Sequence, residues 1–217
     1  MRVGFIQLLL SLVMLAACSA AGPALRVSLS DPRAQYHFDA GTEDWQTFVM
    51  PGDQAVFRIN DGALEGAVVR NSGYIWSLNS VTYPNLSIQA TVQQTQGEAG
   101  NGFGILCRAD AVGNGYYFLI SSSGYFSIRK ATPAQSDPIA LVDWQASDAI
   151  HKGNEPNQLT AICVNDDLMF SINDRLVAEA HDGEFALGQP GVVIGAADET
   201  LWVRFDDIIL RDAAVAG

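Results

Sequence analysis

The chain alternates apolar and polar residues in short segments separated by turn residues, a pattern typical of an all-β sandwich. In "NLSIQATVQQ", residues 85–94, apolar side chains from Leu86 to Val92 occupy every second position. Asp61-Gly62 separates two such runs and predicts a two-residue hairpin. We expect about twelve strands and no helix. The segments with this pattern are 54–69, 85–94, 103–108, 116–121, 125–130, 159–164, 168–173, 176–180, 191–197 and 202–210.

The alternation also assigns side chains to the two faces of each strand, because successive residues point to opposite sides of a sheet. In "GNGYYFLISSSGYFSIRK", residues 113–130, it directs Phe118 and Phe126 into the core. The opposite face then carries polar and aromatic side chains that we expect to meet solvent. They are Tyr117, Tyr125 and Arg129, with Arg108 from the preceding strand.

These side chains have the chemistry of a saccharide groove. Aromatic faces stack on the C–H face of a sugar ring, and arginine donates hydrogen bonds to hydroxyl or carboxylate oxygens. Tyr74 and Trp76 of "SGYIWSL" are further candidates for this surface. The alternative is that the same rings and arginines pair across strands and simply cover the outer sheet. Trp45, Trp144 and Trp202 are expected to anchor the core or the sheet edges.

Two of the three cysteines, Cys107 and Cys163, fall on positions that face the core. Outside the cytoplasm such a pair can oxidise to a disulfide. Buried free thiols remain the alternative, since a bridge also needs Cα atoms within about 7 Å.

The N-terminus reads as a targeting segment. An apolar run from Val3 to Ala17 is shorter than the ~20 residues that a membrane-spanning helix needs, but it suits a signal-peptide core. The following "LAAC" resembles the bacterial lipobox, which implies cleavage before Cys18 and attachment of lipid to that residue. We therefore expect a signal peptide at 1–17, a lipidated tether at 18–34 and an extracytoplasmic protein anchored to a bacterial membrane. An ordinary signal peptide is the alternative.

The charge excludes one class of partner. A formal net charge of −12 with no basic stripe disfavours nucleic acid, whose phosphates repel an acidic protein.

Larger motifs resemble a known family. "FGILCR", "GYYFLISSSGYFSIRK", "NQLTAICVNDDLMFSINDRLVAEAHD" and "VRFDDIIL" are similar to the concanavalin A-like lectin/glucanase jelly rolls, particularly the laminin-G-like branch and 3-keto-disaccharide hydrolase-type domains. The resemblance covers residues 35–211 and leaves a short tail at 212–217. It implies two antiparallel sheets packed as a sandwich.

The resemblance also indicates which chemistry to look for. Glucanases of the family carry Glu-x-Asp-x-x-Glu on one strand, because a retaining mechanism needs two carboxyl groups ~5 Å apart. This chain lacks that pattern, and we assign no catalytic residue. The laminin-G-like branch implies a structural calcium, for which Asp39 and Asp206 are the candidate ligands if the terminal strands pair. No other cofactor or metal is expected, since the three histidines lack metal-binding spacing.

The sequence therefore predicts a non-catalytic, membrane-anchored lipoprotein whose jelly roll binds carbohydrate or a glycosylated surface. A glycan-acting hydrolase of the keto-disaccharide type is one alternative. A protein-interaction or structural module of the cell envelope is another.

Overall fold

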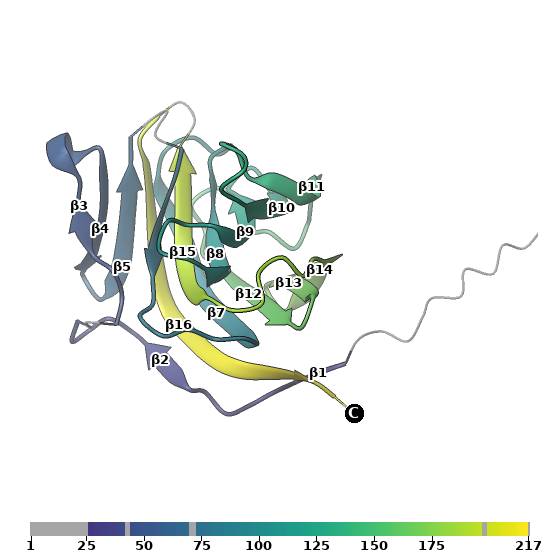
Figure 1. The fold of residues 1–217 in the computed structure, drawn as a ribbon. Coiled ribbons are helices and arrows are strands. Elements are labelled where there is room, and N and C mark those ends of the chain that lie inside the picture. Colours follow the sequence, from purple (N-terminus) through teal and green to yellow (C-terminus); the bar gives the residue numbers. More distant parts are fainter. Residues whose placement is uncertain (1–25, 42–43, 70–72, 197–198, 217) are drawn as a thin grey trace, which may run out of the picture.

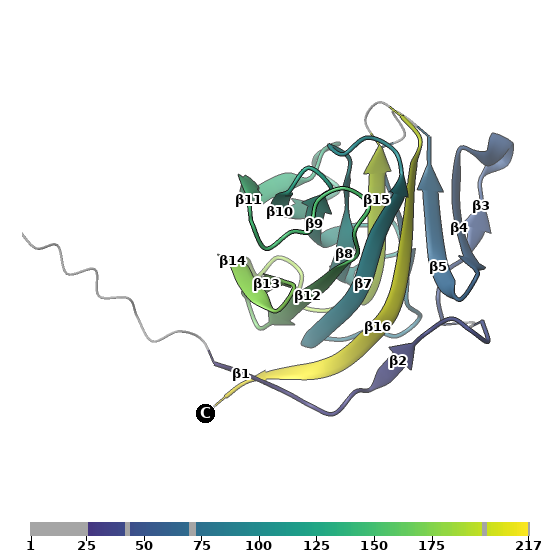
Figure 2. The same cartoon turned by 180° about the vertical axis from the view of Figure 1, so that it is seen from behind.

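The computed structural model describes residues 26–41, 44–69, 73–196 and 199–216. These residues form sixteen strands in two antiparallel sheets that pack face to face (Figures 1 and 2), and the predicted all-β sandwich is confirmed. One 3-10 turn, Pro51–Asp53, is the only helical element within these ranges. None of the described residues forms a helix long and apolar enough to cross a membrane.

The larger sheet has ten strands, with β16 (Leu201–Val215) and β7 (Leu86–Gln96) at its centre. On one side of this pair follow β12 (Asn157–Val164), β13 (Asp167–Ile172) and β14 (Arg175–His181). On the other side lie β5 (Ala63–Val68), β4 (Ala55–Asn60) and β3 (Phe48–Val49). The short strands β1 (Val27–Leu29) and β2 (Ala34–Tyr36) both pair with β16.

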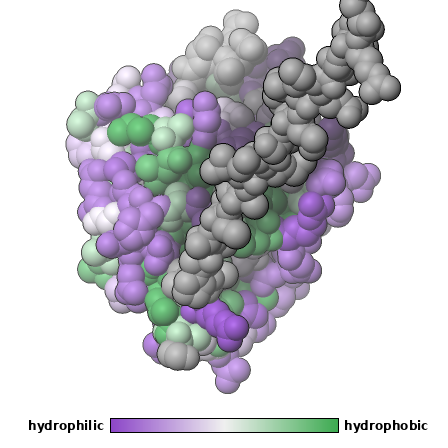
Figure 3. Space-filling model, turned by 90° about the vertical axis from the view of Figure 1, so that its right-hand side faces the viewer, coloured by the Kyte–Doolittle hydropathy of each residue, from purple (hydrophilic) through white to green (hydrophobic). Residues whose placement is uncertain are grey.

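The smaller sheet has six strands and carries the candidate site. Its order is β11 (Ile139–Ala146), β10 (Tyr125–Ala131), β9 (Gly115–Ser121), β8 (Gly102–Ala109), β15 (Gln189–Ala196) and β6 (Gly73–Leu78). Strands β11 and β6 are therefore its two edges. Figure 3 views the molecule from the side of β11 and β14, where hydrophilic residues cover most of the surface and hydrophobic ones form smaller patches.

The core lies between the two sheets, and the predicted strand faces fill it. Phe118 and Phe126 are buried against Phe170 of the opposite sheet, with ring centroids 5.5 and 6.4 Å apart. Tyr117 and Leu119 point to the other side of β9, into a separate apolar cluster. The alternation in 113–130 therefore identified correctly which residues face the core.

A disulfide joins the two sheets. Cys107 on β8 and Cys163 on β12 are fully buried, with Cα atoms 6.7 Å apart and a sequence separation of 56. Closing a loop of this length restricts the unfolded chain by roughly 4 kcal/mol in the chain-entropy model.

The domain is longer at both ends than we expected. Strand β1 and the start of β2 lie in the segment 18–34 that was expected to be a tether, and β16 continues to Val215 in the expected tail. The register pairs Val27 with Val215, so the first and last described strands hold each other in the sheet (Figure 1). Cys18 and the expected signal peptide lie outside the described residues.

Candidate functional site

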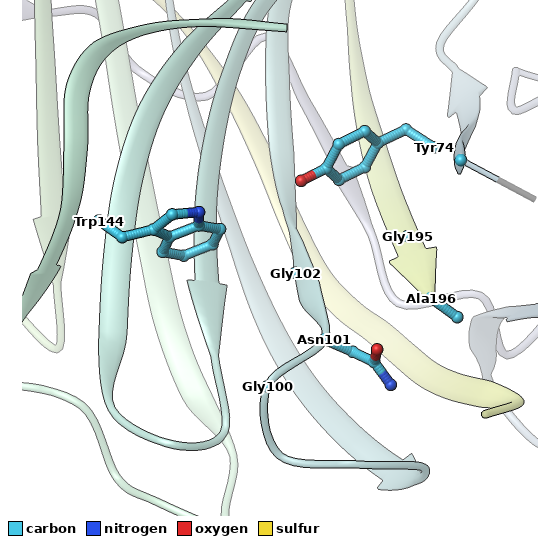
Figure 4. A pocket seen from close by; sticks show the side chains of 8 residues that line it. Tyr74, Gly100, Asn101, Gly102, Trp144, Gly195 and Ala196 are labelled. Carbon is cyan, nitrogen blue, oxygen red and sulfur yellow. The ribbon is translucent and has the colours of Figure 1, made fainter. Parts of the chain in front are cut away.

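A pocket of about 270 Å³ lies on the face of the six-stranded sheet that points away from the core. Tyr74 from β6 and Trp144 from β11 stand on opposite sides of Gly102, and the Tyr74 hydroxyl points toward Trp144 (Figure 4). Gly102 and Gly195 form the floor between them, and Asn101 lies at one end. We call this pocket the aromatic groove.

Strand register explains how the groove forms. Tyr74 is paired with Gly195, and Gly195 with Gly102, so the three residues lie side by side across β6, β15 and β8 on the same face. A Cβ on Gly195 would lie 2.6 Å from Cδ1 of Tyr74, which is closer than real Cβ contacts. A Cβ on Gly102 would lie 3.2 Å from the Tyr74 hydroxyl and 3.5 Å from the ring of Trp144. Glycine at these positions therefore lets the rings lie against the sheet.

A second apolar layer supports the two rings from below. The ring of Tyr74 packs edge-on against Tyr117, with centroids 5.6 Å apart and planes at 86°. Tyr117 is buried and donates a hydrogen bond from its hydroxyl to the carbonyl of Gly113 at 2.7 Å. Burial raises the pKa of both tyrosines above the ordinary value, so both hydroxyls stay neutral donors at physiological pH. The rest of this layer is Leu78, Leu106, Ala109, Leu119 and Val193.

Two residues of the predicted ligand surface are not on the surface. Tyr117 and Arg108 are each only 2% exposed, so the expectation that they meet solvent is wrong. Tyr117 is covered because Tyr74, Trp76 and Trp144 fold over its face of the sheet. Neither side chain is available to stack on or bind an external molecule.

Arg108 instead holds together one end of the sandwich. It lies one residue before the end of β8 with a φ of 54°, at an irregularity in the pairing with β15. Its guanidinium donates hydrogen bonds to the carbonyls of Pro84 and Phe185, at 2.8 and 2.9 Å, and to the side-chain oxygen of Asn85 at 3.1 Å. These acceptors belong to the segments before β7 and after β14, so Arg108 fixes two connections far apart in sequence.

The other predicted residues occupy different places around the groove. Tyr74 forms one wall, and Trp76 packs on Gly113 and lines a neighbouring pocket. Tyr125 is 45% exposed at the start of β10. Arg129 is partly buried and donates from Nε to the carbonyl of Pro138 at 3.3 Å.

Trp144 is the groove residue that the sequence reasoning assigned to another role. It lies on β11 in the long connection between residues 131 and 158, where the strand pattern is weak and the pairing with β10 contains irregularities. Strict alternation in "LVDWQA" would place Val142 and Trp144 on the same face. In the structure Val142 packs against the core between the sheets and Trp144 against the outer apolar cluster, so the irregular pairing of β11 makes simple alternation fail at Trp144.

A second cluster of interest lies where β2 meets β16. The terminal strands do pair, which was the condition for the calcium candidates, and Tyr36 lies opposite Ile208. It brings His37, Asp206 and Asp207 together, with one ligand atom from each within 4.8 Å of the others. The Nδ1 atom of His37 lies 2.8 Å from a carboxylate oxygen of Asp207.

This donor set does not match the calcium site that the resemblance implies. Calcium takes six to eight oxygen ligands, whereas imidazole nitrogen suits zinc and other transition metals. Among the described residues, the group around Asp206 contains His37 and Asp207 and does not include Asp39. We assign no calcium to it.

Comparison with known proteins bears on the fold. The sequence matches no protein-family model and no curated protein sequence. The structure is similar to the carbohydrate-binding module CBM66 from Bacillus subtilis, with a TM-score of 0.63, 19% identity and coverage of 78% of this chain and 96% of that one. A Bacillus subtilis protein of unknown function with a galectin-like fold gives a TM-score of 0.66 at 12% identity, covering 88% of this chain and all of that one.

A third similar structure is a larger protein. The GH43 protein BlXynB from Bacillus licheniformis matches with a TM-score of 0.59 at 13% identity, over 86% of this chain and 40% of its own. Identities this low establish the architecture and leave the activity open. The chain has the concanavalin A-like jelly-roll fold that its sequence motifs resemble.

Proposed function

We propose that the protein binds carbohydrate in the aromatic groove without cleaving it. The observation that carries the proposal is the pair of rings, Tyr74 and Trp144, on either side of a glycine floor. Aromatic rings present an apolar face to the C–H groups of a sugar, and glycine lets the sugar approach the backbone. A pocket of about 270 Å³ is near the lower end of small-molecule sites, roughly 300–1,000 Å³. That size suits one sugar unit at a time.

Polar groups at the groove match the hydroxyls of a sugar. The Tyr74 hydroxyl projects over the floor, and the amide of Asn101 lies at one end (Figure 4). The indole N–H of Trp144 donates no hydrogen bond to another described residue, which leaves it available for a ligand oxygen. A few placed donors and acceptors within an aromatic lining are typical of small-molecule sites.

The composition of the lining supports binding without hydrolysis. Glycoside hydrolysis commonly uses two carboxylic acids on either side of the scissile bond. The described residues that line the groove include glycine, alanine, asparagine, tyrosine and tryptophan, with no aspartate or glutamate among them. The structural similarity to CBM66, whose name describes a carbohydrate-binding module, is consistent with the same role.

We further propose that the protein is a lipoprotein anchored through Cys18 outside the cytoplasm. The support is the "LAAC" sequence after an apolar run and the disulfide between Cys107 and Cys163, because disulfides persist in oxidising compartments. Metabolic labelling with a palmitate analogue tests the anchor. The wild-type chain should incorporate the label and Cys18→Ala should not; equal labelling of both would contradict the proposal.

Affinity electrophoresis through gels that contain cellulose derivatives, xylan, mannan, fructan or pectin tests carbohydrate binding. At least one polysaccharide should retard the wild-type protein, and Tyr74→Ala and Trp144→Ala should each abolish the retardation. Trp202→Ala is the matched control, since this ring lies on the outer face of the other sheet beneath Arg58, 5.2 Å from its guanidinium carbon. Unchanged mobility of the wild type in every gel, or retardation that survives both groove variants, would overturn the proposal. Product analysis after incubation should find no cleavage.

A further inference from the structure

A second pocket, of about 410 Å³, lies against Tyr74, which therefore lines both pockets. Its other lining residues come from two edge strands and from the residues on either side of one of them. Ile75 and Trp76 belong to β6, Phe48 belongs to β3, and Gln46 and Met50 flank β3. The pocket thus opens where the edges of the two sheets meet, beside the aromatic groove.

Packing of its rings into the fold fixes the walls of the second pocket. Phe48 packs edge-on against Phe57, with centroids 5.8 Å apart. Trp76 lies against Gly113, where a Cβ would be 2.7 Å from three of its ring carbons. Both rings are only partly buried, so each keeps a face toward the pocket.

The remaining lining adds a polar group to this apolar surface. Gln46 is exposed, and its backbone is held by hydrogen bonds with Leu78 and Ser77. Its side-chain amide makes no hydrogen bond to another described residue. Met50 is 45% exposed and lies beside it in the lining. The partly exposed aromatic rings repeat the chemistry of the aromatic groove, and the amide of Gln46 adds a polar group to them.

Because Tyr74 lines both pockets, we infer that they are adjacent subsites for one saccharide chain, which lies across the strands and over the sheet edge at β6. The inference rests on the proposed function and extends it to the class of ligand, an oligosaccharide or the interior of a polysaccharide. Neighbouring strands lie about 4.8 Å apart, so the path from Gly102 across β15 to Tyr74 measures about 10 Å. A chain that occupies both pockets therefore contributes more than one sugar unit.

Binding of oligosaccharides of defined length tests this arrangement. Isothermal titration uses cello-, xylo-, manno- and fructo-oligosaccharides of about one to six units. With the series that binds, wild-type affinity should rise by about tenfold as the chain grows long enough to reach the second pocket, and then level off. A Gln46→Ala/Met50→Ala variant should bind the shortest ligands like wild type but lose that tenfold gain. Leu187→Ala, which removes another exposed apolar side chain, should keep it.

The outcomes separate this inference from the proposed function. Wild-type affinity that does not change with length, or a gain that persists in the Gln46→Ala/Met50→Ala variant, overturns the two-subsite arrangement and leaves the aromatic groove as a carbohydrate site. If this variant no longer binds the shortest ligands while its melting temperature is unchanged, the division into two subsites is also overturned. Failure of the wild type to bind any series removes both proposals together.

Discussion

Tyr74 and Trp144 converge above Gly102 from the two opposite edges of the six-stranded sheet. The nearest atoms to a Cβ on Gly102 would be the Tyr74 hydroxyl at 3.2 Å and ring carbons of Trp144 at 3.5 Å. The two residues are 70 positions apart in sequence. Both rings pack on the outer apolar cluster and not in the core between the sheets. The proposed binding site rests on this convergence of two rings over the glycine floor.

Filling the floor should close the groove. Gly102→Ala places a methyl group between the two rings, so we expect at least a tenfold loss of saccharide affinity, measured by titration. The melting temperature should change little, because the nearest neighbours are the ends of side chains. Gly100→Ala adds the same group where nothing lies within 4 Å and should have a smaller effect on affinity. Equal affinities for the two variants would contradict the assigned floor.

Arg108 should act on stability and not on binding. Arg108→Ala removes a buried guanidinium and its three hydrogen bonds, so it should lower the free energy of unfolding by about 3 kcal/mol. Urea denaturation measures this loss. Arg129→Ala, which removes one 3.3 Å hydrogen bond, should cost less than about 1 kcal/mol. A stable Arg108→Ala protein with weakened saccharide binding would restore Arg108 as a ligand residue.

Removing the disulfide should destabilise the sandwich without changing the groove. We expect the Cys107→Ala/Cys163→Ala variant to lose roughly 4 kcal/mol of unfolding free energy, because the unfolded chain gains freedom. Denaturation with and without reductant provides the comparison. The free energy of unfolding of the wild-type protein should fall in the reductant, whereas that of the double variant should not change. Equal stability of all samples would show that the bond contributes nothing.

The ion pair between Lys130 and Asp182 should make stability depend on pH in the acid range. Burial alone would raise the pKa of Asp182, but hydrogen bonds from Lys130, Tyr116 and the Glu184 backbone outweigh it and hold that pKa below its ordinary value. The ionised carboxylate therefore stabilises the fold above about pH 3.8, and this contribution is lost as pH falls through the lowered pKa. Hydrogen bonds to Asp182 and Glu184 raise the pKa of Lys130. Its charge therefore stabilises the fold at neutral pH, and this contribution is lost only in strongly alkaline solution.

Asp182→Asn tests this linkage. It should cost about 2 kcal/mol at pH 7 and progressively less below pH 4, measured by urea denaturation at several pH values. Asp148→Asn is the control, because its partner Arg175 and Asp148 itself are exposed and such pairs contribute about 0–1 kcal/mol. A cost for Asp182→Asn that is independent of pH would contradict the assigned role of the charge.

The sequence was sufficient to predict the architecture, because alternation reports directly on which side chains face the core. Phe118, Ile120, Phe126 and Ile128 are all in the core as expected. The short strands β1 and β2 were missed because three residues are too few to show a period, and they exist only through pairing with β16.

The site was harder to predict because the opposite face of β9 is itself covered. Period-two patterning separates the two faces of a strand but does not report whether a second layer lies on the outer one. Tyr117 is buried by rings from β6 and β11, which are distant in sequence. The buried position of the Arg108 side chain depends on a positive φ and an irregular strand pairing. The residue types alone indicate neither feature.

The indole N–H signals of the four tryptophans offer the most direct test of the central claim. In ¹⁵N-labelled protein titrated with the panel of oligosaccharides, the Trp144 signal should shift and saturate with the binding curve, while those of Trp45 and Trp202 stay in place. Trp144→Phe assigns the signal. Saturable binding that moves Trp202 and leaves Trp144 unchanged would show that the saccharide sits elsewhere and would contradict the account.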